Sequence, residues 1–174
     1  DYQKWSHREG LIVSRGHIVA GIYVHGKLET YDFLPYRPKS YRDFEPIDDL
    51  TATAHYYNNL GAEALLEGSL DRAVGHFRVA VTLAPDFDKA LNNYGVGLTR
   101  LGRTDEAGEV YRKGLALDPE NVPLLANQAR LFQQLGKSEE AEAVLVKLDG
   151  LQNTNPFYFI YRGELALARD DLES

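Results

Sequence analysis

The 34 residues from Ala54 to Phe87 read AHYYNNLGAEALLEGSLDRAVGHFRVAVTLAPDF, and the next 34, from Asp88 to Asn121, read DKALNNYGVGLTRLGRTDEAGEVYRKGLALDPEN. Placed one above the other, the two stretches agree in residue size and type at many positions, and a third stretch, Val122–Asn155, continues the same period. The positions that carry one residue type in all three are Asn59, Asn93 and Asn127, Gly68, Gly102 and Gly136, Ala73, Ala107 and Ala141, and Leu83, Leu117 and Leu151. An internal repeat of 34 residues therefore dominates the chain.

Each stretch predicts two helices joined by a tight turn. In the first stretch, small and apolar residues recur at helical spacing until Gly68, which suits the left-handed position at the end of a helix. A second helix is expected from Asp71, with Phe77 on its buried face. Pro85 ends that helix, and Asp86 offers a cap for the next one. The pattern predicts pairs of antiparallel helices stacked one after another.

This helix–turn–helix pattern resembles the tetratricopeptide repeat. The resemblance implies a mostly α fold, an α-solenoid of three full repeats, 54–87, 88–121 and 122–155, with one further helix in a partial repeat, 156–174. Solenoids of this kind present a concave groove lined by the first helix, or A helix, of each repeat. The resemblance therefore implies a scaffold for protein–protein interaction that binds an extended peptide or a partner protein.

The candidate binding residues follow from the repeat. Asn59, Asn93 and Asn127 occupy the sixth position of three successive A helices, so stacking is expected to set their amides in a row. An amide offers a donor and an acceptor, which match one peptide unit of an extended ligand. Neighbouring inner positions would supply selectivity, and they are Asn58, Asn92, Lys89, Arg100 and Arg130. The three cations among them would favour an acidic or C-terminal carboxylate segment as the ligand. The alternative is that the amides only bond neighbouring helices and stabilise the stack.

Residues 1–45 lack the repeat and differ in charge. They contain 7 Lys and Arg against 6 Asp and Glu, which leaves 12 against 20 for the rest of the chain. An apolar run from Ile18 to Val24, a His25-Gly26 pair and the alternating stretch Lys27–Leu34 predict a β-hairpin. We therefore divide the chain into a hairpin unit with its linker, 1–45, and a repeat domain, 46–174.

The predicted hairpin places Val24 opposite Lys27 and sets His17 and Asp32 on one face. A histidine and an aspartate on adjacent strands form the orienting half of a nucleophilic triad. The stretch from His17 to Asp32 resembles the C-terminal part of a transglutaminase-like, papain-type core, which bacterial proteins join to repeats of this kind. The alternative is a polar pair on a hairpin that docks on the first repeat.

The chain contains no cysteine, and the nucleophile of a transglutaminase-like core is a cysteine that precedes the histidine. This chain is therefore predicted not to be an enzyme by itself. The second functional hypothesis is that it forms the C-terminal portion of a transglutaminase-like cysteine hydrolase whose repeats recruit the substrate. It begins at Asp1 and has no methionine, so we expect a longer protein, in either the cytoplasm or the periplasm.

Composition excludes several other classes of function. A net charge of −7 argues against nucleic acid as the main partner, because phosphate binding depends on Lys and Arg. No apolar run is long enough to span a bilayer, the histidines have no metal-ligand spacing, and no cofactor motif is present.

The partial fourth repeat predicts an apolar surface. Its helix, expected at 156–169, would present Phe159, Leu165 and Ala166 where a second helix of the repeat normally packs. Self-association through this helix, or further repeats, is therefore expected.

Overall fold

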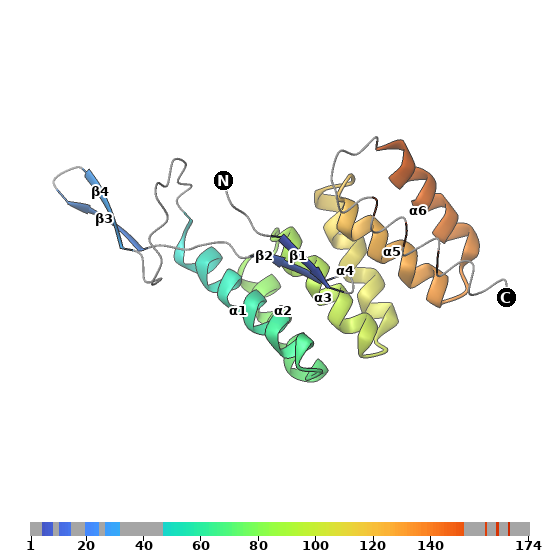
Figure 1. Ribbon diagram of the computed structural model, residues 1–174, viewed down its shortest axis with the longest axis horizontal. Helices are drawn as coiled ribbons and strands as arrows, with labels where there is room; N and C mark the ends of the chain where they lie inside the picture. The colour runs from blue at the N-terminus through green and yellow to red at the C-terminus, as the bar shows by residue number, and fades with distance from the viewer. Residues whose placement is uncertain are drawn as a thin grey trace.

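The computed structural model describes residues 5–8, 11–14, 20–24, 27–31 and 47–151, together with Phe159, Gly163 and Leu167 (Figure 1). The helices of residues 47–151 are α1 (Asp49–Leu66), α2 (Leu70–Leu83), α3 (Asp88–Arg100), α4 (Thr104–Leu117), α5 (Val122–Gln134) and α6 (Ser138–Gly150). The strands are β1 (Trp5–Arg8), β2 (Leu11–Ser14), β3 (Ala20–Val24) and β4 (Lys27–Tyr31). The mostly α repeat architecture predicted from the sequence is confirmed.

The helices form two layers (Figure 1). The A helices α1, α3 and α5 contact one another in sequence order and make one layer. Each of the B helices α2 and α4 packs against its own A helix and against the next one, while α6 packs against α5. We call the side of the A layer that faces away from the B helices the inner face.

The three turns between A and B helices share one geometry. Gly68, Gly102 and Gly136 have φ values of 80°, 78° and 69°, a region that L side chains rarely adopt. After each glycine, a backbone N–H bonds back to the helix, as in Ser69 N–H to the Ala64 carbonyl at 2.8 Å. Glycine at the helix ends, predicted from the repeat, is therefore required by the backbone.

Helix starts agree with the sequence in part. Asp48 caps α1 by accepting a hydrogen bond from the Thr51 N–H at 2.9 Å, and Asn121 caps α5 in the same way through Leu124. The prediction of Asp86 as a cap is wrong. The N-cap of α3 is Phe87, whose N–H bonds to the Ala84 carbonyl in a turn that carries the chain past Asp86.

Small residues in the A helices let aromatic rings of the B helices approach closely. A Cβ atom built on Gly61 would stand 2.5 Å from Cε1 of Phe77, and one built on Gly95 would overlap the ring of Tyr111. Phe77 and Tyr111 are fully buried. Phe77 also approaches Gly97 of the next repeat, so its ring fills the space between α1 and α3.

The N-terminal strands form two antiparallel hairpins. In the second one, Val24 pairs with Lys27 and Ala20 pairs with Tyr31, the register that the sequence predicts. The first hairpin, in which Ile12 pairs with His7, was not anticipated, because Trp5–Arg8 is short and shows no apolar alternation. His17 and Asp32 lie outside the described residues, so the prediction that they share a face stays untested.

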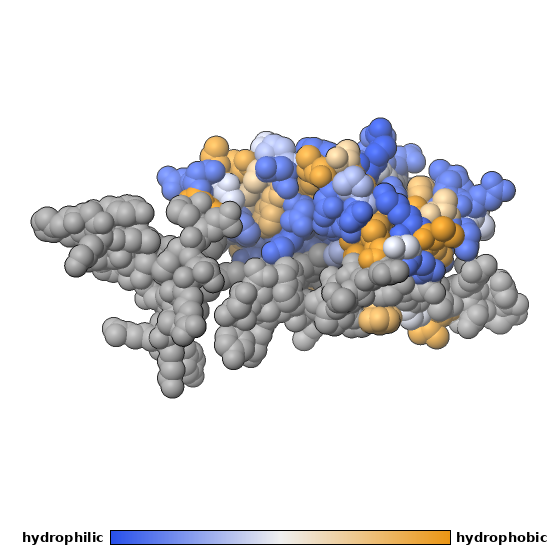
Figure 2. Space-filling view, turned by 90° about the horizontal axis from the view of Figure 1, so that it is seen from above, coloured by the Kyte–Doolittle hydropathy of each residue, from blue (hydrophilic) through white to orange (hydrophobic). Residues whose placement is uncertain are grey.

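The described surface is mixed in character. Figure 2 shows a face that is mainly hydrophilic, with separate hydrophobic patches. Phe159 and Leu167 are both 67% exposed, whereas Leu165 and Ala166 are not among the described residues. Self-association through the C-terminal stretch stays a prediction. Among the residues described, no helix is both long and apolar enough to cross a bilayer.

The close approach of α3 and α4 makes Gly95 sensitive to substitution. Gly95→Ala should lower the free energy of unfolding by about 1–3 kcal/mol, because the new methyl group overlaps the Tyr111 ring. Gly75 lies inside α2 with open space where an added Cβ would stand, so Gly75→Ala should instead raise the free energy of unfolding by about 0.5–1 kcal/mol. Urea denaturation followed by circular dichroism measures both. Equal effects of the two substitutions would contradict the packing described here.

Candidate functional site

The inner face of α3 is defined by helical spacing. Gly95 and Leu98 pack toward α4, where Tyr111 lies. The side chains turned away from that contact recur at three- and four-residue intervals. They are Lys89, Asn92, Asn93, Val96 and Arg100. The corresponding residues of α1 include Asn58 and Ala62, and those of α5 include Asn127 and Arg130.

Buried amides run across this face from α5 to α1. The Arg130 guanidinium donates to Asn127 Oδ1 at 2.9 Å, and Asn127 Nδ2 donates to Asn92 Oδ1 at 2.8 Å. Asn92 Nδ2 lies 3.3 Å from Asn93 Oδ1, and Asn93 Nδ2 donates to Asn58 Oδ1 at 3.0 Å. All four asparagines are at most 3% exposed. We call these four residues and Arg130 the amide relay.

The relay differs from the predicted row of Asn59, Asn93 and Asn127. Bonds between successive A helices join residues 35 apart, Asn58 to Asn93 and Asn92 to Asn127, rather than equivalent residues 34 apart. The fifth position of one repeat therefore meets the sixth position of the next. Asn59 has no repeat before it to supply such a partner among the described residues, and it is exposed.

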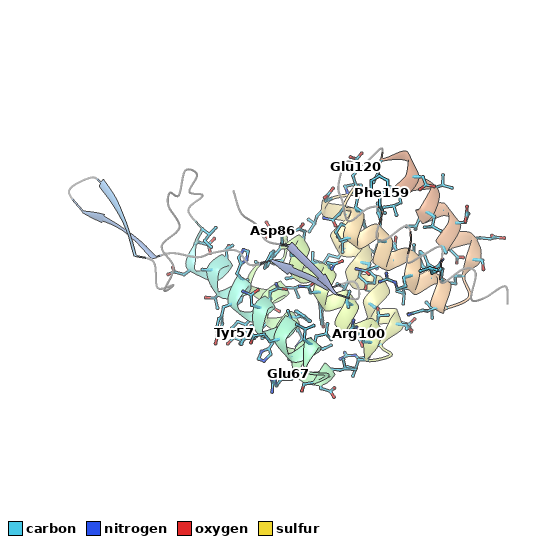
Figure 3. All side chains as sticks on the ribbon, viewed as in Figure 1. Tyr57, Glu67, Asp86, Arg100, Glu120 and Phe159 are labelled. Atoms are coloured by element: carbon cyan, nitrogen blue, oxygen red, sulfur yellow. The ribbon has the colours of Figure 1, made fainter. Side chains whose placement is uncertain are left out.

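The cations predicted for selectivity lie on the inner face with the relay. Arg130 is held by Asn127, and Arg100 lies in the last turn of α3 (Figure 3). Lys89 and Arg100 are half-buried, as is Arg130. The relay asparagines of α3 and α5 and these three cations each make at least one further interaction beyond those given above. The structure thus brings Asn92, Asn93 and Asn127 together with Arg130, while Asn59 stands apart.

Two ionisable rings have shifted pKa values, His55 of α1 and Tyr111 of α4 on the opposite side of the A layer. Burial, and to a lesser extent the charge of Lys89, lowers the pKa of His55 below its usual value. Its ring lies 4.2 Å from that of Phe87, centroid to centroid. Burial raises the pKa of Tyr111 to about 12, so this hydroxyl stays protonated and lies 3.5 Å from Thr99 Oγ1. Both rings are therefore neutral at pH 7.

The apolar part of the inner face was not predicted from the sequence. Ala62 and Val96 are 3% and 5% exposed and follow Asn58 and Asn92 by one helical turn. Ala62, Val96 and Arg130 are equivalent positions at the offset of 34 residues, so the prediction of Arg130 on the inner face could have identified the two apolar residues as well. Within the described residues, no group of three or more histidine or carboxylate side chains could hold a metal ion.

Comparison with known proteins agrees with this architecture. A family model described as tetratricopeptide repeat matches residues 98–156. The chain belongs to the tetratricopeptide repeat family. Membership of this family makes it a protein-interaction scaffold and favours binding over catalysis.

Curated relatives include a repeat protein of Mycosarcoma maydis, small glutamine-rich tetratricopeptide repeat-containing protein 2. It is 34% identical over 88 residues, 51% of this chain and 25% of its own length. Photosystem I assembly protein Ycf3 of Acaryochloris marina is 30% identical over 103 residues, 58% of this chain and 62% of its own length. The chain thus spans about a quarter of the first relative and less than two thirds of the second.

Solved structures share the fold. The tetratricopeptide repeat domain of Arabidopsis OM64 superposes with a TM-score of 0.59 at 17% identity, covering 67% of this chain and 97% of that one. The first such domain of Spaghetti (RPAP3), bound to an HSP90 peptide, has a TM-score of 0.60 at 19% identity, covering 71% and 96%. These identities establish the fold alone.

The relay predicts a large difference between Asn59 and Asn93, which occupy the same position of successive repeats. Asn93→Ala should lower the free energy of unfolding by about 1–3 kcal/mol, because it removes two hydrogen bonds between buried side chains, those with Asn58 and Asn92. Asn59→Ala, at an exposed position, should change it by less than about 0.5 kcal/mol. Thermal and urea denaturation of both variants measure this. A loss at Asn59 as large as that at Asn93 would contradict the assignment.

Proposed function

We propose that this chain binds an extended segment of a partner protein along the inner face of α1, α3 and α5. The observation that carries the proposal is the composition of that face. It combines a continuous line of amides with Lys89, Arg100 and Arg130, in a chain whose net charge is −7. Three cations thus lie on the face where the repeats place their amides.

The relay amides have a structural role, because two of their hydrogen bonds join buried side chains of successive A helices. An asparagine side chain also carries N–H donors and acceptor lone pairs, the same kinds of group that peptide main chain pairs with. In the proposed complex, the ligand main chain bonds to amides of this face. This combines the two interpretations that the sequence left open.

The charges favour an acidic ligand. Arg130 is fixed by its bond to Asn127, so its guanidinium is already oriented for a carboxylate and loses little freedom on binding. The domain of Spaghetti (RPAP3), which has the same fold, is bound to a peptide of sequence SRMEEVD, which carries three acidic side chains. An acidic or C-terminal carboxylate segment is accordingly the proposed ligand. The exclusion of nucleic acid, made from net charge alone, stays a prediction.

A library of short extended peptides, identical except for acidic, neutral or basic side chains and for a free or amidated C-terminus, tests this. By fluorescence anisotropy, acidic peptides should bind best, and Arg130→Gln should weaken that binding roughly tenfold by removing a charge-assisted hydrogen bond. Arg112, 70% exposed on α4 and paired with Glu109, provides the matched control, because Arg112→Gln should leave affinity unchanged. Preference for basic peptides, or equal losses in both variants, would refute the proposal.

A further inference from the structure

The hairpin of β1 and β2 lies next to the repeat domain. Strand β2 contacts both α1 and α3, and Figure 1 shows the hairpin drawn across α3. Helix α2 also contacts α1 and α3, and it does so from the B layer. No contact of similar extent joins β2 to α2 or α4, which puts the strand on the inner face of α1 and α3.

Burial on that face supports the placement. Ala62 of α1 and Val96 of α3 are only 3% and 5% exposed, although the inner layer of a solenoid has no further layer of helices over it. Asn58 and Asn93, beside them, are at most 1% exposed. Ala62 and Val96 pack in one cluster with Phe77, and the strand that contacts α1 and α3 adds a cover on the side away from the B helices.

We infer that the β1–β2 hairpin is an intramolecular occupant of the inner face, and that a partner has to displace it in order to bind. The inference rests on the proposed function for the identity of the competing ligand. A strand offers the same main-chain donors and acceptors as an extended peptide, so the two ligands suit the same face. Because a partner binds only molecules whose inner face is free of the hairpin, its apparent affinity is the intrinsic affinity multiplied by the fraction of such molecules.

Introduced cysteines can measure whether the β1–β2 hairpin covers the inner face, because the chain has no cysteine of its own. Val96→Cys places a thiol on the inner face, and Val146→Cys places one on α6, where Val146 is 62% exposed. Ile12→Pro removes a backbone N–H from β2 and disrupts its pairing with His7. Ile22→Pro makes the same change in β3 and is the matched control.

Reaction with a maleimide is followed without any partner present. Ile12→Pro should raise the labelling rate of Val96→Cys roughly tenfold, because the face becomes open, while Ile22→Pro leaves it unchanged. Neither change should alter the labelling of Val146→Cys, and far-UV circular dichroism should show the helices intact. A second probe on α1, Ala62→Cys, should respond as Val96→Cys does. An Ile12→Pro variant with intact helices and unchanged labelling at both probes would overturn the inference.

Peptide binding separates this inference from the proposed function. An acidic peptide should bind roughly tenfold more tightly to Ile12→Pro than to the parent chain, by the removal of a competitor. Faster labelling without binding of any peptide would support the inference that the hairpin covers the face, and it would refute the proposed ligand. Peptide binding that is equally tight in both proteins, together with unchanged labelling, would refute the cover and keep the function.

Discussion

The pairing of buried amides between successive A helices is the constraint on which the inner layer depends. A buried amide without a partner costs about 1–3 kcal/mol, so each asparagine has to meet its counterpart. Asn58 reaches Asn93, and Asn92 reaches Asn127, in both cases across 35 residues. Apolar packing tolerates small sliding between helices, whereas these bonds do not. The relay therefore fixes the register of one repeat on the next.

Contacts between the layers complete this arrangement. Gly61 and Gly95 let the rings of Phe77 and Tyr111 come within van der Waals contact of the A-helix backbone. The B helices can then fill the spaces between A helices with large apolar groups, which leaves the polar relay on the opposite side. One side of each A helix is thus assigned to packing and the other to hydrogen bonding, and the second side carries the cations proposed to bind a ligand.

Much of the repeat fold could be predicted from the 34-residue period of the sequence alone. The 34-residue offset identified Gly68, Gly102 and Gly136 as turn residues, because the same backbone conformation recurs at each turn. The offset also identified the asparagine columns, but it assigned Asn59 to the row. A sequence period gives equivalent positions, whereas contact between repeats depends on how one A helix is rotated and shifted against the next. That shift of one residue is a property of the packed layers.

The cover over the inner face was less accessible to sequence reasoning. Docking on the first repeat was predicted for the hairpin around His17 and Asp32 and stays untested, whereas the strand that contacts α1 and α3 is β2, formed by Leu11–Ser14. A short strand without alternation carries little information on its partner.

The account is tested most directly by a double-mutant cycle on Asn92 and Asn127, the bonded pair between α3 and α5. Free energies of unfolding are measured for Asn92→Ala, Asn127→Ala and the double variant. If the amides fix the repeats to each other, removing both should cost about 1–3 kcal/mol less than the two single losses added together. Losses that add to within about 0.5 kcal/mol would contradict the account, because they would show that the two amides do not act as a pair.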